Sequence, residues 1–265
     1  MAERSEAKRA IRAAFEGAAP SYDEAASVQR EICRHLSLMA HSHGLIDQRG
    51  LLLDVGCGTG FGLECLAALA PGAERIALDF AHAMLRRLAV APDTYPLCAD
   101  LEAIPLSDGC VDGVWSSLAL QWSTPDRAFP ELVRVLKPGG RAWLASLGPQ
   151  TFHELRSAFE AVDQARHVID FHAPESWAQC AISAGFEIRA LERRECFAWS
   201  ATLRGLLRDI RAIGAHSLGD GPRKPLNRQQ WRQLEAAYEA CRRGNGLLPA
   251  TYDVILAVLE RPKPR

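Results

Sequence analysis

The stretch LLLDVGCGTGFG, residues 51–62, decides how the rest of the chain is interpreted. Its three leucines run into Asp54 and Val55 without polar alternation, which is typical of a parallel strand covered on both faces. Glycines then occupy every second position, at 56, 58 and 60, and an apolar helical pattern continues from Leu63 to Leu69. A strand, a glycine turn and a helix in this order predict a nucleotide site at the carboxyl edge of a doubly wound sheet.

The glycine spacing excludes two common phosphate-binding motifs. No frame of these glycines supplies G-x-G-x-x-G, and no lysine comes after them to complete a P-loop. The pattern Asp54-x-Gly56-x-Gly58-x-Gly60 instead resembles motif I of the class I S-adenosylmethionine-dependent methyltransferases. The resemblance implies a Rossmann-like α/β fold, a doubly wound seven-stranded sheet with helical lid insertions. It also implies S-adenosyl-L-methionine as cofactor, released as S-adenosyl-L-homocysteine. A glycine turn without a ligand is the alternative.

Length and composition favour one core. The chain has 265 residues, of which 48% are hydrophobic, enough for one substantial core without requiring two domains. We expect a single methyltransferase domain over residues 1–265. Within it, residues 1–48 form N-terminal helices, residues 49–148 the cofactor-binding half, and residues 149–265 a substrate half with a helical lid and closing strands.

The charge limits the possible binding partners, and the cysteines indicate the cellular compartment. The net charge of −1 gives no sign of nucleic-acid binding, although residues 201–265 carry 12 Lys/Arg against 6 Asp/Glu. That basic third is either a solvated face or a surface for an acidic partner. The eight cysteines form no C-x-x-C pair, and those in apolar runs, such as Cys57, Cys98 and Cys110, are expected as small buried hydrophobes. Without a signal peptide or a run of about 20 apolar residues, we expect a soluble, cytoplasmic protein.

The remaining pattern predicts alternating helices and strands. Apolar spacing predicts helices over 4–16 and 24–43, separated by a loop at residues 20–23. Strands are expected at 51–55, 75–78, 95–99, 111–116, 141–147, 187–199 and 250–259. Helices are expected at 63–69, 129–136, 151–164, 174–186, 203–213 and 228–240, with a turn at LKPGG before the fifth strand. The first five strands thus belong to successive βα units.

Side chains at the strand ends are candidate cofactor contacts. Asp79 comes after the second strand, about 20 positions after the glycines, where an acid accepts hydrogen bonds from ribose hydroxyls; a helix N-cap is the alternative. Phe80 and Met84 come next and are expected to flank the adenine. In the resembled class, Asp100 bonds the adenine amino group and Leu101 lies near the ring. The predicted cofactor contacts are Tyr22, Asp54, Gly56, Gly58, Gly60, Asp79, Phe80, Met84, Asp100, Leu101, Ser116 and Leu118.

A narrower resemblance covers nearly the whole chain. The segments FEGAAPSYDEAASVQR, LALQWS, TFHELRSAF, HVIDF, IRAIGAH and LPATYDV resemble the malonyl-acyl-carrier-protein O-methyltransferases of biotin synthesis. In related methyltransferases a Tyr-Asp pair folds over the cofactor, which implies a catalytic-site position for Tyr22; the alternative is a packing residue. Gln121 and Trp122 are assigned to the same site as the pocket wall. Asp170 departs from the family, in which Arg or Gln often precedes the Phe.

The implied chemistry is methylation of a carboxylate. A malonyl carboxylate is an anion at neutral pH, so the protein must align the reacting atoms and exclude water rather than remove a proton. Arg211 is the candidate cation to orient this carboxylate, with His167 and His216 as further candidates. The predicted substrate contacts are Trp122, Phe152, His167, Phe171, Arg211 and His216. His41 and His43 have no third ligand nearby, so no metal is expected.

The basic C-terminal third is predicted to dock an acyl carrier protein that bears a malonyl thioester, through Arg204, Arg208 and Arg211. We expect a monomer that binds neither nucleic acid nor membrane. Two other functions remain open. One is a methyltransferase for a small acid or a quinone ring with different lid contents. The other is a non-catalytic, cofactor-binding assembly factor, since respiratory complex I assembly proteins also resemble this sequence.

Overall fold

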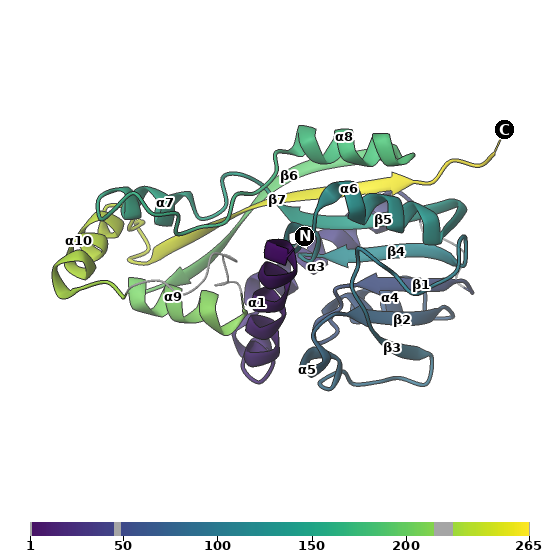
Figure 1. The fold of residues 1–265 in the computed structure, drawn as a ribbon, viewed down its shortest axis with the longest axis horizontal. Coiled ribbons are helices and arrows are strands. Elements are labelled where there is room, and N and C mark those ends of the chain that lie inside the picture. The colour runs from purple at the N-terminus through teal and green to yellow at the C-terminus, as the bar shows by residue number, and fades with distance from the viewer. Residues whose placement is uncertain (1, 45–48, 215–224, 265) are drawn as a thin grey trace.

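A single mixed sheet organises the chain, and the computed structural model describes residues 2–44, 49–214 and 225–264. Its seven strands lie in the order β3-β2-β1-β4-β5-β7-β6 (Figure 1). The strands are β1 Leu51–Val55, β2 Glu74–Asp79, β3 Thr94–Cys98, β4 Val111–Ser117, β5 Leu136–Leu147, β6 Glu187–Ser200 and β7 Leu248–Glu260. The predicted doubly wound, seven-stranded α/β sheet is thereby confirmed.

The order of strands creates the crevice in which this fold class binds ligands. Strands β1 to β5 pair in parallel, with β1 between β2 and β4. The chain therefore winds outward in one direction from β1 to β3 and in the other from β4 to β5. The carboxyl ends of β1 and β4 border this switch point, where open α/β sheets take their ligands. Strand β7 runs antiparallel between β5 and β6.

Helices cover both faces of the sheet, and others lie beyond one end of it. They are α1 Ala2–Ala18, α2 Tyr22–Ala25, α3 Ser27–Ser42, α4 Phe61–Leu69, α5 His82–Leu85, α6 Pro125–Val135, α7 His153–Glu160, α8 Pro174–Ala184, α9 Leu203–Ala212 and α10 Arg228–Glu239. Figure 1 shows α7, α9 and α10 grouped around the far ends of β6 and β7, with α1 between this group and β1–β3. No helix in the described ranges is long and apolar enough to cross a membrane.

Both sheet faces are packed, which explains the uninterrupted apolar runs. On one face Trp115 and Leu36 belong to the buried cluster that includes α3, and on the other Phe129 and Trp177 pack β4 and β5 against α6 and α8. Every residue of β7 except Glu260 is buried. Burial on two sides stabilises a strand without the polar alternation of a surface strand.

Two expectations about local structure were wrong, and several other element ends differ from the expected ones by a few residues. The predicted helix 24–43 is interrupted at Ala26, whose backbone leaves the helical region at φ −89° and ψ 35°, and Tyr22 begins the short helix α2 rather than lying in a loop. The segment LKPGG belongs to β5 rather than to a turn before it. It pairs through Leu136 with Val111, and the register then shifts before Arg141 pairs with Gly113. A bulge of this kind absorbs glycines within a strand.

Candidate functional site

The turn after β1 has a backbone that favours glycine. Gly56, Gly58 and Gly60 have φ values of 73°, 54° and 109°, in the left-handed region. The N–H of Gly56 donates to the Leu78 carbonyl at 2.7 Å, which fastens the turn to the end of β2. A Cβ added to Gly56 would lie 2.1 Å from the Cβ of Ala119. Gly56 is therefore packed against Ala119, whereas a Cβ added to Gly58 would meet only Tyr22, at 3.9 Å, so the turn leaves open backbone surface at Gly58, which suits a bound ligand.

Asp79 connects this turn to the next loop. Its Oδ2 accepts the N–H of Gly58 at 2.9 Å, and its Oδ1 accepts the N–H of Ala81 at 2.8 Å, at the start of α5. Burial raises the pKa of Asp79 to about 6, against the lowering effect of these backbone donors. A carboxylate has further lone pairs beyond the two used here. The side chain can therefore both order the loops and accept hydrogen bonds from a ligand.

A small cavity of about 70 Å³ lies against the turn and Asp79. Most of the predicted cofactor contacts line it, contributed by α2, the glycine turn and the loops after β2, β3 and β4. These positions are Tyr22, Gly56, Gly58, Asp79, Phe80, Met84, Asp100, Leu101 and Leu118. These groups fit S-adenosylmethionine, because the glycine backbone, a buried acid and apolar side chains meet around one space.

Three predicted cofactor contacts do not line this cavity. Ser116 is fully buried and its hydroxyl donates to the Val55 carbonyl at 2.9 Å, so Ser117 faces the cavity instead. Gly60 precedes α4 as its N-cap. Asp54 is buried, and burial, together with the smaller effect of the Asp79 charge, raises its pKa well above the usual range. Its Oδ2 has no hydrogen-bond partner in the described part of the chain.

Helix α1 supplies cavity residues that the sequence did not indicate. Lys8 and Phe15 line the small cavity, and Lys8 pairs with Asp100 and, at 2.7 Å, with Glu102. Glu16 accepts the N–H groups of His82 and Ala83, at 2.8 and 2.9 Å. These links join α1 to the loops after β2 and β3, so the helix closes one side of the cavity. The apolar spacing that includes Phe15 predicts a helix but not its position, and the resemblance of the segment that begins at Phe15 implies a site role only for Tyr22.

A second, larger cavity of about 1040 Å³ adjoins the first. The predicted substrate positions in the described ranges line it, and Gln121 does too, with its side-chain amide donating to the Leu118 carbonyl at 2.8 Å. His216 lies outside the described residues. The positions that line the cavity are Trp122, Phe152, His167, Phe171 and Arg211.

Charged groups are sparse in the larger cavity. Arg211 is the only arginine or lysine among the described residues that line it. His167 stacks on Phe159, with ring centroids 3.5 Å apart, and its Nε2 lies 2.7 Å from an Asp163 oxygen. The histidine therefore already has an acidic neighbour. Arg211 is the better-placed group for a substrate anion in an otherwise mostly apolar space.

The two cavities share a wall of aromatic and apolar side chains. Phe15, Tyr22, Leu118 and Trp122 line both cavities. The ring of Trp122 meets Phe15 edge to face, with centroids 5.5 Å apart. Burial raises the pKa of Tyr22, so its hydroxyl is neutral at physiological pH. A group bound in one cavity and a group bound in the other would meet at this wall.

The other sequence predictions fall on the surface or inside the packing. Arg204, Arg208 and Arg211 are exposed on α9; Arg204 pairs with Glu235 at 3.6 Å and Arg208 with Asp209 at 3.2 Å. Among the cysteines expected in the interior, Cys57 is buried and Cys110 is half-buried. Cys98 is exposed, contrary to expectation, because it ends the outermost strand, β3, whose side chains are mostly exposed.

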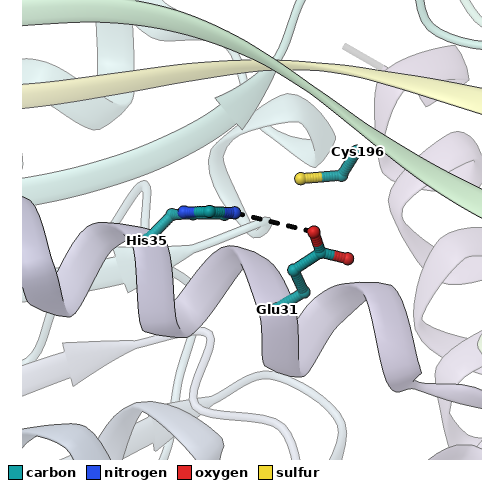
Figure 2. Close-up of side chains that lie close together, drawn as sticks. All are labelled: Glu31, His35 and Cys196. Atoms are coloured by element: carbon teal, nitrogen blue, oxygen red, sulfur yellow. Dashed lines mark ion pairs between the residues drawn. The ribbon is translucent and has the colours of Figure 1, made fainter.

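One group of side chains away from the cavities has metal-ligand types. Glu31 and His35 lie one turn apart on α3 and face Cys196 of β6 (Figure 2), with their ligand atoms all within 4.8 Å of one another. His35 Nε2 lies 3.6 Å from a Glu31 oxygen. Burial and the Glu31 charge raise the pKa of the Cys196 thiol to about 11, which disfavours the thiolate that a metal needs. The expectation of no metal stays a prediction.

Comparisons with known proteins agree with this geometry. The family described as "Methyltransferase domain" matches residues 53–144. A malonyl-[acyl-carrier protein] O-methyltransferase from Dechloromonas aromatica is 45% identical over 94% of this chain and 92% of its own. The biotin biosynthesis bifunctional protein BioHC of Teredinibacter turnerae is 37% identical over 97% of this chain and 48% of that longer protein.

The sheet and its helices also match solved structures. A geranyl diphosphate C-methyltransferase from Streptomyces coelicolor, in complex with Mg²⁺, geranyl diphosphate and S-adenosyl-L-homocysteine, superposes with a TM-score of 0.51 at 15% identity, over 85% of this chain and 78% of that one. Likeness at this identity concerns the fold. The methyl donor of this methyltransferase is S-adenosylmethionine. The chain belongs to the malonyl-[acyl-carrier protein] O-methyltransferase family of S-adenosylmethionine-dependent methyltransferases.

Proposed function

We propose that this protein transfers a methyl group to the free carboxylate of a malonyl thioester carried by an acyl carrier protein. The product is the methyl ester that begins the pimeloyl part of biotin synthesis. The observation that carries the proposal is the pair of adjoining cavities, one beside the glycine turn and one mostly apolar with a single arginine among its described lining residues. We place this monomeric enzyme, as a single domain with a helical lid, in the cytoplasm.

The acceptor needs no base. The malonyl carboxylate has a pKa near ~4 and is an anion at neutral pH. S-adenosylmethionine supplies an electrophilic methyl group on a sulfonium centre. The protein's part is to align the acceptor oxygen and to exclude water, which together supply several kcal/mol. This agrees with a cavity pair whose shared wall, among the described residues, offers no pair of acid and base side chains.

The wall between the cavities positions the reacting groups. Tyr22 and Trp122 of this wall, with Gln121 beside them in the larger cavity, hold the acceptor against the donor, and the neutral Tyr22 hydroxyl adds no charge there. On the donor side, the glycine turn and Asp79 bind the amino-acid and ribose parts, while Phe80 and Leu101 flank the adenine. Helix α1 and the rings of Phe15 and Trp122 exclude water.

Arg211 orients the acceptor carboxylate. A guanidinium binds a carboxylate through two parallel hydrogen bonds, which fixes the plane of the anion as well as its position. Because the rest of the larger cavity is mostly apolar, the acyl chain and the thioester pack against Phe152 and Phe171. Replacement of Arg211 by Ala is expected to raise KM for the malonyl substrate and to leave the binding of S-adenosylhomocysteine unchanged.

The carrier protein docks on the basic face of α9. Charge reversal at Arg204, Arg208 and Arg211 is expected to weaken the use of carrier-protein substrate while sparing cofactor binding. Because Arg211 also orients the acceptor carboxylate, the double reversal at Arg204 and Arg208 isolates the contribution of docking. Reversal at the exposed Arg194 of β6, which pairs with Glu192 at 3.1 Å, is the control. Unchanged kinetics with the carrier protein in the triple variant would remove this docking surface from the proposal.

The test of the reaction uses labelled S-adenosylmethionine with malonyl carrier protein, malonyl-CoA and free malonate. We expect preferential labelling of the carrier protein, and mild base should release the label because it is a methyl ester. Turnover of free malonate without any gain from a carrier protein would indicate a small-molecule methyltransferase. Cofactor binding without label on any acceptor would indicate an assembly factor.

A further inference from the structure

A groove of about 490 Å³ lies between α9 and α10, outside the small cavity and the larger cavity. Figure 1 shows both helices at the same end of the molecule. Helix α9 contributes Arg204, and α10 contributes Arg228, Trp231, Arg232 and Glu235. These four α10 positions have the i, i+3, i+4 and i+7 spacing of one helix face. The groove therefore has a wall on which two arginines lie one turn apart.

The groove is basic, and only one of its three arginines, Arg204, forms an ion pair within the described part of the chain. Three arginines against one glutamate give it a net charge of +2. Arg204 pairs with Glu235 at 3.6 Å and lies 4.7 Å from the centre of the Trp231 ring. Arg228 and Arg232 are exposed and form no ion pair within the described part of the chain. Two unpaired guanidinium groups on one helix face can bind one anion together.

Side chains, rather than the start of α10, must hold such an anion. Asn227 caps this helix: its side-chain oxygen accepts the N–H groups of Gln229 and Gln230, both at 2.9 Å. The amides that could otherwise face an anion are thereby occupied. Arginine is suited to phosphate because its planar fork of N–H groups matches two phosphate oxygens.

The groove adjoins the larger cavity. Leu226 and Trp231 line both spaces, so the groove lies directly beside this side of the larger cavity. A malonyl thioester on a carrier protein sits at the end of a long phosphopantetheine arm. That arm is neutral along most of its length and carries one phosphodiester where it joins the protein. Its charge pattern matches an apolar cavity that leads into a basic groove.

We propose that Arg228 and Arg232 bind the phosphodiester of the phosphopantetheine arm, so that this groove is the entrance for the substrate. The inference rests on the proposed function for the identity of the arm. It adds a specific phosphate site on α10 to the docking of the carrier protein on α9. The same chemistry occurs in coenzyme A, whose phosphates also reach this groove; the carrier protein then adds its own surface contacts.

Binding tests the site without any methyl transfer. The probes are 4′-phosphopantetheine and pantetheine, which differ by the phosphate. Calorimetry measures the binding of both, and ³¹P NMR follows the phosphate of the first. We expect the wild type to bind the phosphorylated probe at least about tenfold more tightly. The double variant Arg228→Ala/Arg232→Ala should lose this preference. The control Arg194→Ala/Arg243→Ala removes two exposed arginines elsewhere and should retain it.

Kinetics then connect the site to the substrate. With malonyl-phosphopantetheine, the Arg228→Ala/Arg232→Ala variant should show a KM raised about tenfold at unchanged kcat, and with malonyl-pantetheine it should equal the wild type. Equal binding of both probes by the wild type, or an equal loss with both substrates in the variant, would overturn the phosphate site. Phosphate-dependent binding without methyl transfer to any malonyl acceptor would support the site and refute the proposed function instead.

Discussion

Replacement of Gly62 by Ala is a sharp test of the packing beneath the glycine turn. Gly62 is the second residue of α4, where alanine is normally preferred by about 1 kcal/mol. A Cβ at this position would lie 2.4 Å from Asp54 Oδ2 and 2.8 Å from both Cδ1 and Nε1 of Trp115. The Trp115 side chain is fully buried, and the Asp54 oxygen and the Trp115 nitrogen have no partner within the described residues.

The clash should offset or outweigh the gain in helix propensity. Overpacking of this kind costs about 1–3 kcal/mol and the gain is about 1 kcal/mol, so we expect a net loss of up to about 2 kcal/mol in the free energy of unfolding. Urea denaturation should report this loss, and thermal melting should fall by about 3 °C per kcal/mol. The matched control is Gly17→Ala in α1, where an added Cβ meets nothing within 4 Å and should be neutral or slightly stabilising. Equal effects of both substitutions would refute the predicted clash.

Asp79, Tyr238 and Cys196 each offer a shorter test. Because the pKa of Asp79 in the folded protein is raised to about 6, the native state holds more protons than the unfolded state between about pH 4 and 6. The free energy of unfolding therefore falls as pH rises through that window. Asp79→Asn should flatten this slope in urea denaturation at a series of pH values. Binding of S-adenosylhomocysteine should strengthen as pH rises through about 6, as Asp79 becomes a carboxylate, and calorimetry should show no such rise in Asp79→Asn. Tyr238→Phe removes a buried hydrogen bond of 2.7 Å to the Pro249 carbonyl and should cost about 1–2 kcal/mol in urea denaturation. Metal analysis should find no stoichiometric zinc in the wild type or in Cys196→Ser.

Local patterns along the chain predicted the part of the fold that holds the glycine turn. The apolar run into Asp54 predicts β1 because burial on both faces removes polar alternation. The distance from the glycines to Asp79 places the acid at the end of β2, beside the turn. Both features depend on neighbours within a few tens of residues. They could therefore be inferred without knowledge of distant contacts.

Features set by long-range packing could not be predicted. Ser116 is the predicted cofactor contact and the predicted end of its strand. In the structure β4 continues to Ser117, and Leu118 then turns with φ 59°. The segment LKPGG is predicted as a turn before the fifth strand. The Gly139 N–H instead donates to the Arg261 carbonyl at 2.7 Å, a partner far along the chain that the local sequence does not reveal.

The position of α1 depends on long-range contacts of the same kind. Glu16 accepts two N–H groups at the start of α5, and α5 carries Met84 into the small cavity. Phe15, its neighbour, lines both cavities. The side chain of Glu16 therefore acts as an N-terminal cap supplied by another helix, and such a cap contributes about 1 kcal/mol.

Loss of this cap should destabilise both α1 and the wall of the small cavity. In Glu16→Ala we expect the affinity for S-adenosylhomocysteine to fall about fivefold, which corresponds to about 1 kcal/mol, and hydrogen exchange to increase in both α1 and α5. Glu6→Ala changes an exposed acid on the same helix and is the control. Faster exchange confined to α1 in Glu16→Ala, with unchanged affinity, would mean that the helix covers the cavity without shaping it. Coupled changes in α1, α5 and ligand affinity would instead make α1 part of the binding site, which no local motif in residues 2–18 indicates.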